Sequence, residues 1–226
     1  MFTQEALPVG NAVAEAYADP PWWYDLRGFM ILKLSYRGSL WDQLTFFERN
    51  LSDQHLEAAI GTGTLFGYVL RLRRWRQGKL PQRIVGVDYA ERMLAGAARR
   101  FRTLPSVWLR QADLTALDLP NDTFQTANIA NAVHCISDVD AALQELFRVL
   151  QPGGTLALNV LVPPRGNALV RWISSRVNAW GVRKGILYRP YTPEEMRERL
   201  EACGFQIREE RVSGNICWIT AVKPAN

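Results

Sequence analysis

The residues best suited to chemistry begin with Gly61 and Gly63, which follow a short apolar run in the segment LEAAIGTGT (56–64). A strand that passes through such a turn into a helix presents unpaired backbone N–H groups, and the glycines let a ligand approach where a Cβ would obstruct it. The segment therefore favours a nucleotide-like ligand. The alternative is that the glycines only form a tight turn between a strand and a helix.

Two carboxylates follow the next two apolar runs and could contact the same ligand. Asp88 ends the run RIVGVD, where a carboxylate can accept hydrogen bonds from both hydroxyls of a ribose. The alternative for Asp88 is a cap on the helix that follows. Asp113 comes after the run SVWLRQ and can accept from an exocyclic adenine amine, while Leu114 covers the face of the base.

The elements that must position these residues alternate between apolar runs and amphipathic stretches. The apolar runs lie at 56–60, 83–88, 106–111, 124–133 and 155–162, and the helices between them are expected to end near residues 74, 102 and 150. This alternation predicts an α/β fold with a Rossmann-like, doubly wound, mostly parallel sheet of seven strands. The last two strands, 205–212 and 216–223, should form a hairpin that makes the final strand antiparallel.

Helical segments flank this core. Residues 10–50 carry apolar positions at steps of three and four, interrupted at Asp19-Pro20-Pro21, and predict a helical cap over 1–51 in front of a core domain at 52–226. Thr192, Pro193 and Glu195 form a capping box at a later helix, which Gly204 should end. The insertion 163–190 follows the fifth strand and is expected to lie over the ligand-binding edge.

The composition is that of an ordinary globular protein, with 226 residues, 48% of them hydrophobic, and a net charge of +5. Its three cysteines are far apart and show no CxxC spacing, so we expect neither a disulfide framework nor a metal site. No signal-peptide pattern and no run of roughly 18 apolar residues is present. We therefore expect a cytoplasmic protein.

Four motifs, in the order in which they occur along the chain, resemble those of the class I S-adenosylmethionine (SAM)-dependent methyltransferases. The resemblance is to the small-molecule branch that includes ubiquinone and menaquinone C-methyltransferases in particular. The motifs are LEAAIGTGT, VGVDYAERML, the segment 111–136 and the segment 138–159. The resemblance implies SAM as cofactor and S-adenosylhomocysteine (SAH) as product. The cofactor-binding residues that it implies are Glu57, Gly61, Thr62, Gly63, Asp88, Tyr89, Met93, Asp113, Leu114 and Asn131.

By this resemblance Glu57 faces the methionine ammonium, Tyr89 faces the adenine ring, and Asn131 lies near the methionine or the acceptor. A dinucleotide is disfavoured because the third glycine is Gly67, one position later than G-x-G-x-x-G requires. Ala59 stands where relatives usually carry a further glycine. We therefore expect the cofactor to bind, and the sequence does not predict its affinity.

The acceptor is expected to be a small, partly hydrophobic or aromatic molecule, methylated on oxygen, nitrogen or carbon. The aromatic side chains Trp23, Tyr24, Tyr36 and Trp172 lie in the cap and the insertion, where they could form a dry wall around it or only pack the cap onto the core. His134 could contact the acceptor and serve as general base. A wall residue without a chemical role is the favoured alternative for His134.

Other functions stay open at this point. The sequence Asp19-Pro20-Pro21-Trp22 resembles a motif of nucleic-acid adenine methyltransferases, but it follows a helical pattern instead of a strand, so nucleic acid is not expected. The basic stretch 71–79 is most simply a solvated helix end, whereas the cations in 163–190 could hold an anionic acceptor or contact a membrane surface. A SAM-binding protein that catalyses cyclisation, or a scaffold without activity, is also consistent with these motifs. Nothing indicates the oligomeric state.

Overall fold

A computed structural model describes residues 39–162, 176 and 190–225, and places seven strands in one sheet of order β3-β2-β1-β4-β5-β7-β6. The strands are β1 (Gln54–Ala58), β2 (Arg83–Asp88), β3 (Val107–Gln111), β4 (Phe124–Ile129), β5 (Leu150–Leu161), β6 (Gln206–Ser213) and β7 (Ile216–Val222). β7 pairs antiparallel with both β5 and β6, and the other pairs are parallel. The predicted Rossmann-like fold with an antiparallel final strand is confirmed.

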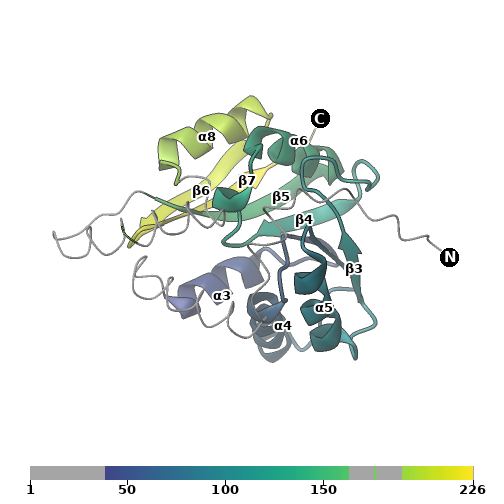
Figure 1. Ribbon diagram of the computed structural model, residues 1–226. Helices are drawn as coiled ribbons and strands as arrows, with labels where there is room; N and C mark the ends of the chain where they lie inside the picture. The colour runs from purple at the N-terminus through teal and green to yellow at the C-terminus, as the bar shows by residue number, and fades with distance from the viewer. Residues whose placement is uncertain (1–38, 163–175, 177–189, 226) are drawn as a thin grey trace.

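Helices cover both faces of the sheet (Figure 1). One face carries α3 (Leu40–Arg49), α4 (Thr64–Gln77) and α5 (Glu91–Phe101), and the other carries α6 (Val139–Val149) and α8 (Pro193–Ala202). A short 3-10 turn, η1 (Val133–Cys135), follows β4. Each face has its own buried apolar cluster, because alternate residues of each strand point to opposite sides.

The predicted capping box at α8 is present. The Thr192 hydroxyl accepts from the Glu195 backbone N–H at 3.1 Å, and the Thr192 N–H donates to the Glu195 carboxylate at 2.9 Å. The helix ends at Ala202, and Gly204 then takes a positive φ of 98°, which glycine adopts without steric cost.

Two strand boundaries differ from the prediction by four residues or more, and the others by at most two. β4 ends at Ile129 instead of 133, because Asn131 turns into the left-handed region (φ 56°) and η1 begins at Val133. β5 begins at Leu150 instead of 155. The segment Pro152-Gly153-Gly154 has the composition of a turn, yet Gly153 and Gly154 exchange backbone hydrogen bonds with Lys223 at 2.8 and 2.9 Å, and a register shift absorbs the extra residues.

The helix α3 falls within the predicted cap segment and packs on the core. Phe46 and Phe47 lie against Trp218 of β7, with ring centroids 5.1 and 6.2 Å away, and the Asn50 side chain donates to the Ala127 carbonyl of β4 at 2.8 Å. Residues 1–38, and the insertion apart from residues 176 and 190, lie outside the described residues. The division into cap, core and insertion therefore stays a prediction.

Candidate cofactor site and active site

The candidate site lies where the strand order reverses. β1 pairs with β2 on one side and with β4 on the other, so the segments after these three parallel strands leave the sheet at one edge. Ligands of such sheets bind at this edge, in the crevice between diverging connections. The predicted residues Gly61, Asp88 and Asn131 all follow or end these strands.

The glycine turn after β1 holds three residues in the left-handed region, namely Ala59 (φ 57°), Gly61 (φ 58°) and Gly63 (φ 71°). The two glycines serve different purposes. A Cβ on Gly63 would come within 2.4 Å of the Phe101 side chain, so this glycine allows α5 to pack beside the start of α4. A Cβ on Gly61 would meet nothing within 4 Å, so space in front of Gly61 is open to a ligand.

Asp88 holds the turn and the next helix together. Its Oδ2 accepts from the Gly61 N–H at 2.7 Å, and its Oδ1 accepts from the Ala90 N–H, at the N-cap of α5, at 2.9 Å. Burial raises the pKa of this carboxyl, and the backbone hydrogen bonds oppose that rise. Asp88 contacts the residue before α5 but does not cap the helix, whose N-cap is Ala90 without a side-chain cap, and the ribose contact stays a prediction.

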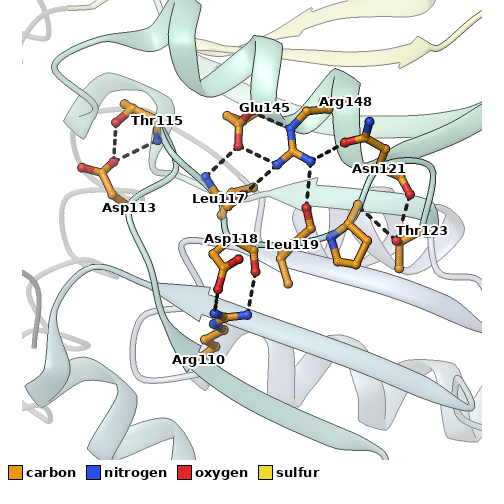
Figure 2. A network of polar contacts seen from close by, with 11 residues as sticks. Arg110, Asp113, Thr115, Leu117, Asp118, Leu119, Asn121, Thr123, Glu145 and Arg148 are labelled. Carbon is orange, nitrogen blue, oxygen red and sulfur yellow. Dashed lines mark hydrogen bonds and ion pairs between the residues drawn. The ribbon is translucent and has the colours of Figure 1, made fainter. Parts of the chain in front are cut away.

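The segment after β3 carries Asp113 and Leu114. The Oδ1 of Asp113 accepts from both the backbone N–H and the hydroxyl of Thr115, at 2.9 and 2.8 Å (Figure 2). Leu114 is buried in the core. The carbonyl of Tyr89 accepts from the Gln111 side chain at 3.0 Å, which links the end of β2 to the end of β3. These contacts place the residues predicted for adenine on adjacent segments.

Arg148 on α6 fixes the loop between β3 and β4 (Figure 2). It donates to the carbonyls of Leu117 and Leu119, each at 2.7 Å, and to the Asn121 side chain at 2.6 Å. Glu145 accepts from the Leu117 N–H and from Arg148, all at 2.7 Å, and this pairing lowers the pKa of Glu145 and raises that of Arg148. Sequence reasoning missed this clamp, although a Glu and an Arg three positions apart on a helix are a typical pair.

Glu57 belongs to a buried chain of hydrogen bonds on the side of the sheet that α3 and α4 cover. It lies 3.2 Å from Nε2 of His55, whose Nδ1 lies 2.8 Å from the Thr126 hydroxyl, which in turn lies 2.7 Å from the hydroxyl of Ser52. Phe66 of α4 stacks on the His55 ring.

The two acid–base groups of this chain are both driven to their neutral forms. Burial raises the pKa of Glu57 well above its usual range, against a hydrogen bond from Asn128, and burial together with the charge of Arg73 lowers the pKa of His55 to about 3. Both shifts favour the neutral forms of Glu57 and His55, and which group donates in each contact depends on the His55 tautomer. The contact with a methionine ammonium predicted for Glu57 stays a prediction, since the partners shown are His55 and Asn128.

Asn131 is held by two side chains that sequence reasoning missed. Its Oδ1 accepts from Gln43 of α3 at 2.8 Å and from Asn159 of β5 at 2.6 Å, and its backbone N–H donates to the Asn159 side chain at 2.7 Å. Gln43 and Asn159 are almost completely buried. Both donors converge on Oδ1, so the orientation of the Asn131 amide is fixed. Asn159 was visible as a polar residue in an apolar strand, whereas nothing in the sequence distinguished Gln43.

His134 lies in η1, close in sequence to Asn131, and is 8% exposed. Burial lowers its pKa to about 4, and within the described part of the chain its Nδ1 has no hydrogen-bond partner. Thr62 and Met93 are buried at 5% and 2% exposure, so their side chains pack within the protein. Trp23, Tyr24, Tyr36 and Trp172 lie outside the described residues.

Two properties of the described residues bear on the class of protein. No group of three or more His, Cys, Asp or Glu within residues 39–162, 176 and 190–225 is placed to hold a metal ion. Across those same residues, no helix is both long enough and apolar enough to cross a bilayer.

Known proteins resemble this chain in sequence and in fold. A family model described as a methyltransferase domain matches residues 56–158. The chain is also 30% identical, over 180 residues, to a demethylmenaquinone methyltransferase from Thermus thermophilus, and the match covers 73% of this chain and 79% of that protein. The chain belongs to the class I SAM-dependent methyltransferases, in their ubiquinone/menaquinone C-methyltransferase-like branch.

A second relative supports this membership, and a solved structure shares the fold. A 2-phytyl-1,4-naphtoquinone methyltransferase from Thermosynechococcus vestitus is 34% identical over 127 residues, which are 56% of this chain and 54% of that relative, so the match spans about half the relative's length. The fold is similar to that of a SAM-dependent methyltransferase from Thermotoga maritima, with a TM-score of 0.64 at 19% identity, covering 90% of this chain and 98% of the other. SAM is the cofactor of this methyltransferase.

Proposed function

We propose that this methyltransferase acts on a small, partly hydrophobic aromatic acceptor of the quinone type. The observation that carries the proposal is the match over 79% of a demethylmenaquinone methyltransferase. The second relative is named for a naphthoquinone that bears a phytyl chain, which is an apolar substituent. Both relatives are named as methyltransferases of quinones, so we assign the same acceptor class to this chain.

The residues at the sheet edge fit SAM, which supplies an electrophilic methyl group. Gly61 leaves open space at the turn after β1, and Asp88, which accepts from the Gly61 N–H, brings a carboxylate to the position suited to ribose hydroxyls. We propose that Tyr89, Asp113 and Leu114 surround the adenine and that Asn131 borders the methionine part. None of these positions carries a Lys or Arg that would repel a sulfonium.

We assign His134 a role in bordering the acceptor instead of general-base catalysis. Its buried imidazole with a pKa of about 4 is neutral at pH 7, but a base that weak gains little driving force for removing a proton from an acceptor. Orientation and exclusion of water would then supply most of the acceleration. His134→Asn should lower kcat by less than roughly tenfold, and a loss of roughly 100-fold or more would instead establish a base.

The cap and insertion belong to the same proposal. We propose that residues 1–51 and 163–190 close over the acceptor, with Trp23, Tyr24, Tyr36 and Trp172 as its apolar walls. Protection of these segments from proteolysis by SAH together with an acceptor, but not by SAH alone, would support this. The cytoplasmic location predicted from the sequence is part of the proposal as well.

The acceptor class is tested by incubating the protein with SAM carrying a deuterated methyl group and a panel of acceptors. The panel contains demethylated naphthoquinols and benzoquinols with short isoprenoid tails, simple phenols and aromatic acids, and mass spectrometry locates the label. Labelled quinol is the expected result. Label only in phenols, acids or added RNA or DNA would refute the quinone class, and an isomer of unchanged mass would reveal cyclisation.

A further inference from the structure

The outward face of α4 carries large aromatic side chains in water. Tyr68, Arg71 and Trp75 recur at steps of three and four residues, so they form one stripe along the helix. Tyr68 is 45% exposed and Trp75 is 77% exposed. Trp41, on the neighbouring helix α3, is 54% exposed. Three large aromatic residues so exposed on two packed helices are more typical of a contact surface than of ordinary solvated helices.

An arginine guanidinium lies near the ring of Tyr68 and another near the ring of Trp41. Trp75 is flanked in the sequence by Arg74 and Arg76. The Arg71 guanidinium lies 5.4 Å from the centre of the Tyr68 ring, and the Arg76 guanidinium lies 5.8 Å from that of Trp41. We call the surface formed by Trp41, Tyr68, Arg71, Arg74 and Trp75 the α3–α4 face. Its aromatic rings and positive charges are interleaved.

Only part of the positive charge of α4 is paired with carboxylates in the described residues. α4 contains four arginines and no carboxylate. Glu48 of α3 is buried and already contacts Arg73 and Arg76 at 3.4 and 3.0 Å. Arg71 and Arg74 are exposed and make no ion pair within the part of the chain that the structure describes. These two guanidinium groups are therefore available to an anionic partner.

We propose that the α3–α4 face binds an anionic lipid bilayer, with Trp41, Tyr68 and Trp75 in the headgroup region and the arginines on lipid phosphates. Tryptophan and tyrosine are favoured at this depth because one part of the ring system is apolar and another is polar, and arginine adds attraction to anionic headgroups. This binding is peripheral and does not depend on which acceptor is methylated. It would bring the enzyme to the phase in which an apolar acceptor dissolves.

A nucleic acid fits this face less well. Single strands are held in a groove by rings whose faces are free to stack on bases. Here the rings of Tyr68 and Trp41 already lie beside guanidinium groups, and the stripe follows the outer surface of a helix. A bilayer surface requires neither a groove nor free ring faces.

The test measures sedimentation of the full chain with vesicles of phosphatidylcholine alone, or of phosphatidylcholine mixed with phosphatidylglycerol, at low and high salt. We expect binding to the anionic vesicles only, weakened by salt. Arg71→Gln with Arg74→Gln should lower the partition coefficient about fivefold for each arginine. Trp41→Ala with Trp75→Ala should lower it on the order of tenfold or more, since apolar surface is then no longer buried.

Matched controls lie elsewhere on the same chain. Trp108 is 65% exposed on β3, and because its neighbours Val107 and Leu109 pack toward the α3–α5 side, Trp108 points to the opposite side of the sheet. Trp108→Ala should leave vesicle binding unchanged, and so should the charge control Arg110→Gln, which lies on the same side of β3 as Trp108. Calorimetry with SAH should give the same affinity for every variant, which shows that each one is folded.

Several results would overturn the proposal. These are no binding to anionic vesicles by a chain that binds SAH, an equal loss in Trp108→Ala, and sedimentation that depends on self-association instead of lipid. Binding of single-stranded nucleic acid, lost in the α3–α4 variants while vesicles are not bound, would assign the face to a different partner.

Discussion

Replacing Ala59 by glycine should stabilise the protein, although glycine usually weakens a buried strand end. Ala59 has a φ of 57°, and a Cβ in the left-handed region costs about 1.5 kcal/mol. Against this gain, glycine destabilises the folded state by about 0.7 kcal/mol, because it raises the conformational entropy of the unfolded chain. The methyl group is half-buried against the core, and its loss costs about 0.4 kcal/mol. The net expectation for Ala59→Gly is a gain of about 0.4 kcal/mol.

Ala58 offers a matched control because it is the preceding alanine, fully buried, and within the regular strand β1. Ala58→Gly relieves no strain, and it loses a whole buried methyl group in addition to the entropy term. Its expected cost is about 1.5 to 2 kcal/mol. The two variants should therefore have opposite signs and differ by about 2 kcal/mol in the free energy of unfolding.

The assay is urea unfolding of the two variants and the wild type, followed by circular dichroism. Thermal melts should place Ala59→Gly about 1 °C above the wild type and Ala58→Gly about 5 °C below it. Titration with SAH should give an affinity for Ala59→Gly equal to or higher than that of the wild type, since only a methyl group beside the cofactor edge is removed. Equal destabilisation by both substitutions would refute the account of strain at Ala59.

The remaining predictions address the other site residues. Asp88→Ala should weaken SAH binding by roughly 10- to 100-fold in calorimetry and also destabilise the protein by about 2 kcal/mol, because the Gly61 and Ala90 N–H groups lose their acceptor; unchanged affinity in a folded variant would refute the ribose role. Gln43→Glu should weaken SAH binding more than Gln82→Glu on the surface, since a carboxylate placed against Asn131 Oδ1 repels it, and equal effects would contradict a positioning role. His134 has a pKa of about 4 in the folded state and about 6.5 when unfolded, so its contribution to stability is lost as pH falls from 6.5. In urea titrations between about pH 7.5 and about pH 5, the wild type should lose about 2 kcal/mol more of its free energy of unfolding than His134→Asn does. Parallel pH profiles of the two proteins would contradict the burial of His134. Arg148→Met should lower the free energy of unfolding by about 2 kcal/mol and speed amide hydrogen exchange in residues 113–123. Unchanged exchange there would show that the order of the loop does not depend on Arg148.

The sequence was sufficient to predict the elements that local pattern controls. Apolar runs and glycine turns predicted all seven strands, and the capping box at Thr192 predicted the start of α8 to the residue. The early start of β5 was not predictable in this way, because Pro152-Gly153-Gly154 has the composition of a turn and pairs only through contacts with Lys223. Local composition cannot report a partner so distant in the chain.

Much of the candidate site depends on such distant partners. The orientation of Asn131 is set by Gln43, 88 positions away, and by Asn159, 28 positions away. Strand periodicity does place His55 and Glu57 on one side of the sheet, but the shifts of their pKa values toward the neutral forms follow from burial beneath α3 and α4, which spacing alone does not give. The residue types at the cofactor edge were predictable from the sequence, and the side chains that orient them were not.

The different surroundings of Gly61 and Gly63 affect how homologous sequences should be compared. A relative that no longer binds the cofactor would still keep glycine at 63, because any larger residue meets Phe101, unless residue 101 had become smaller as well. Position 61 meets no such obstruction, and asparagine tolerates its backbone conformation. Divergence at position 61, with 63 and 101 unchanged, would therefore mark descendants that have lost the ligand but kept the fold. A change at 63 would require both a smaller residue at 101 and a residue that tolerates a positive φ.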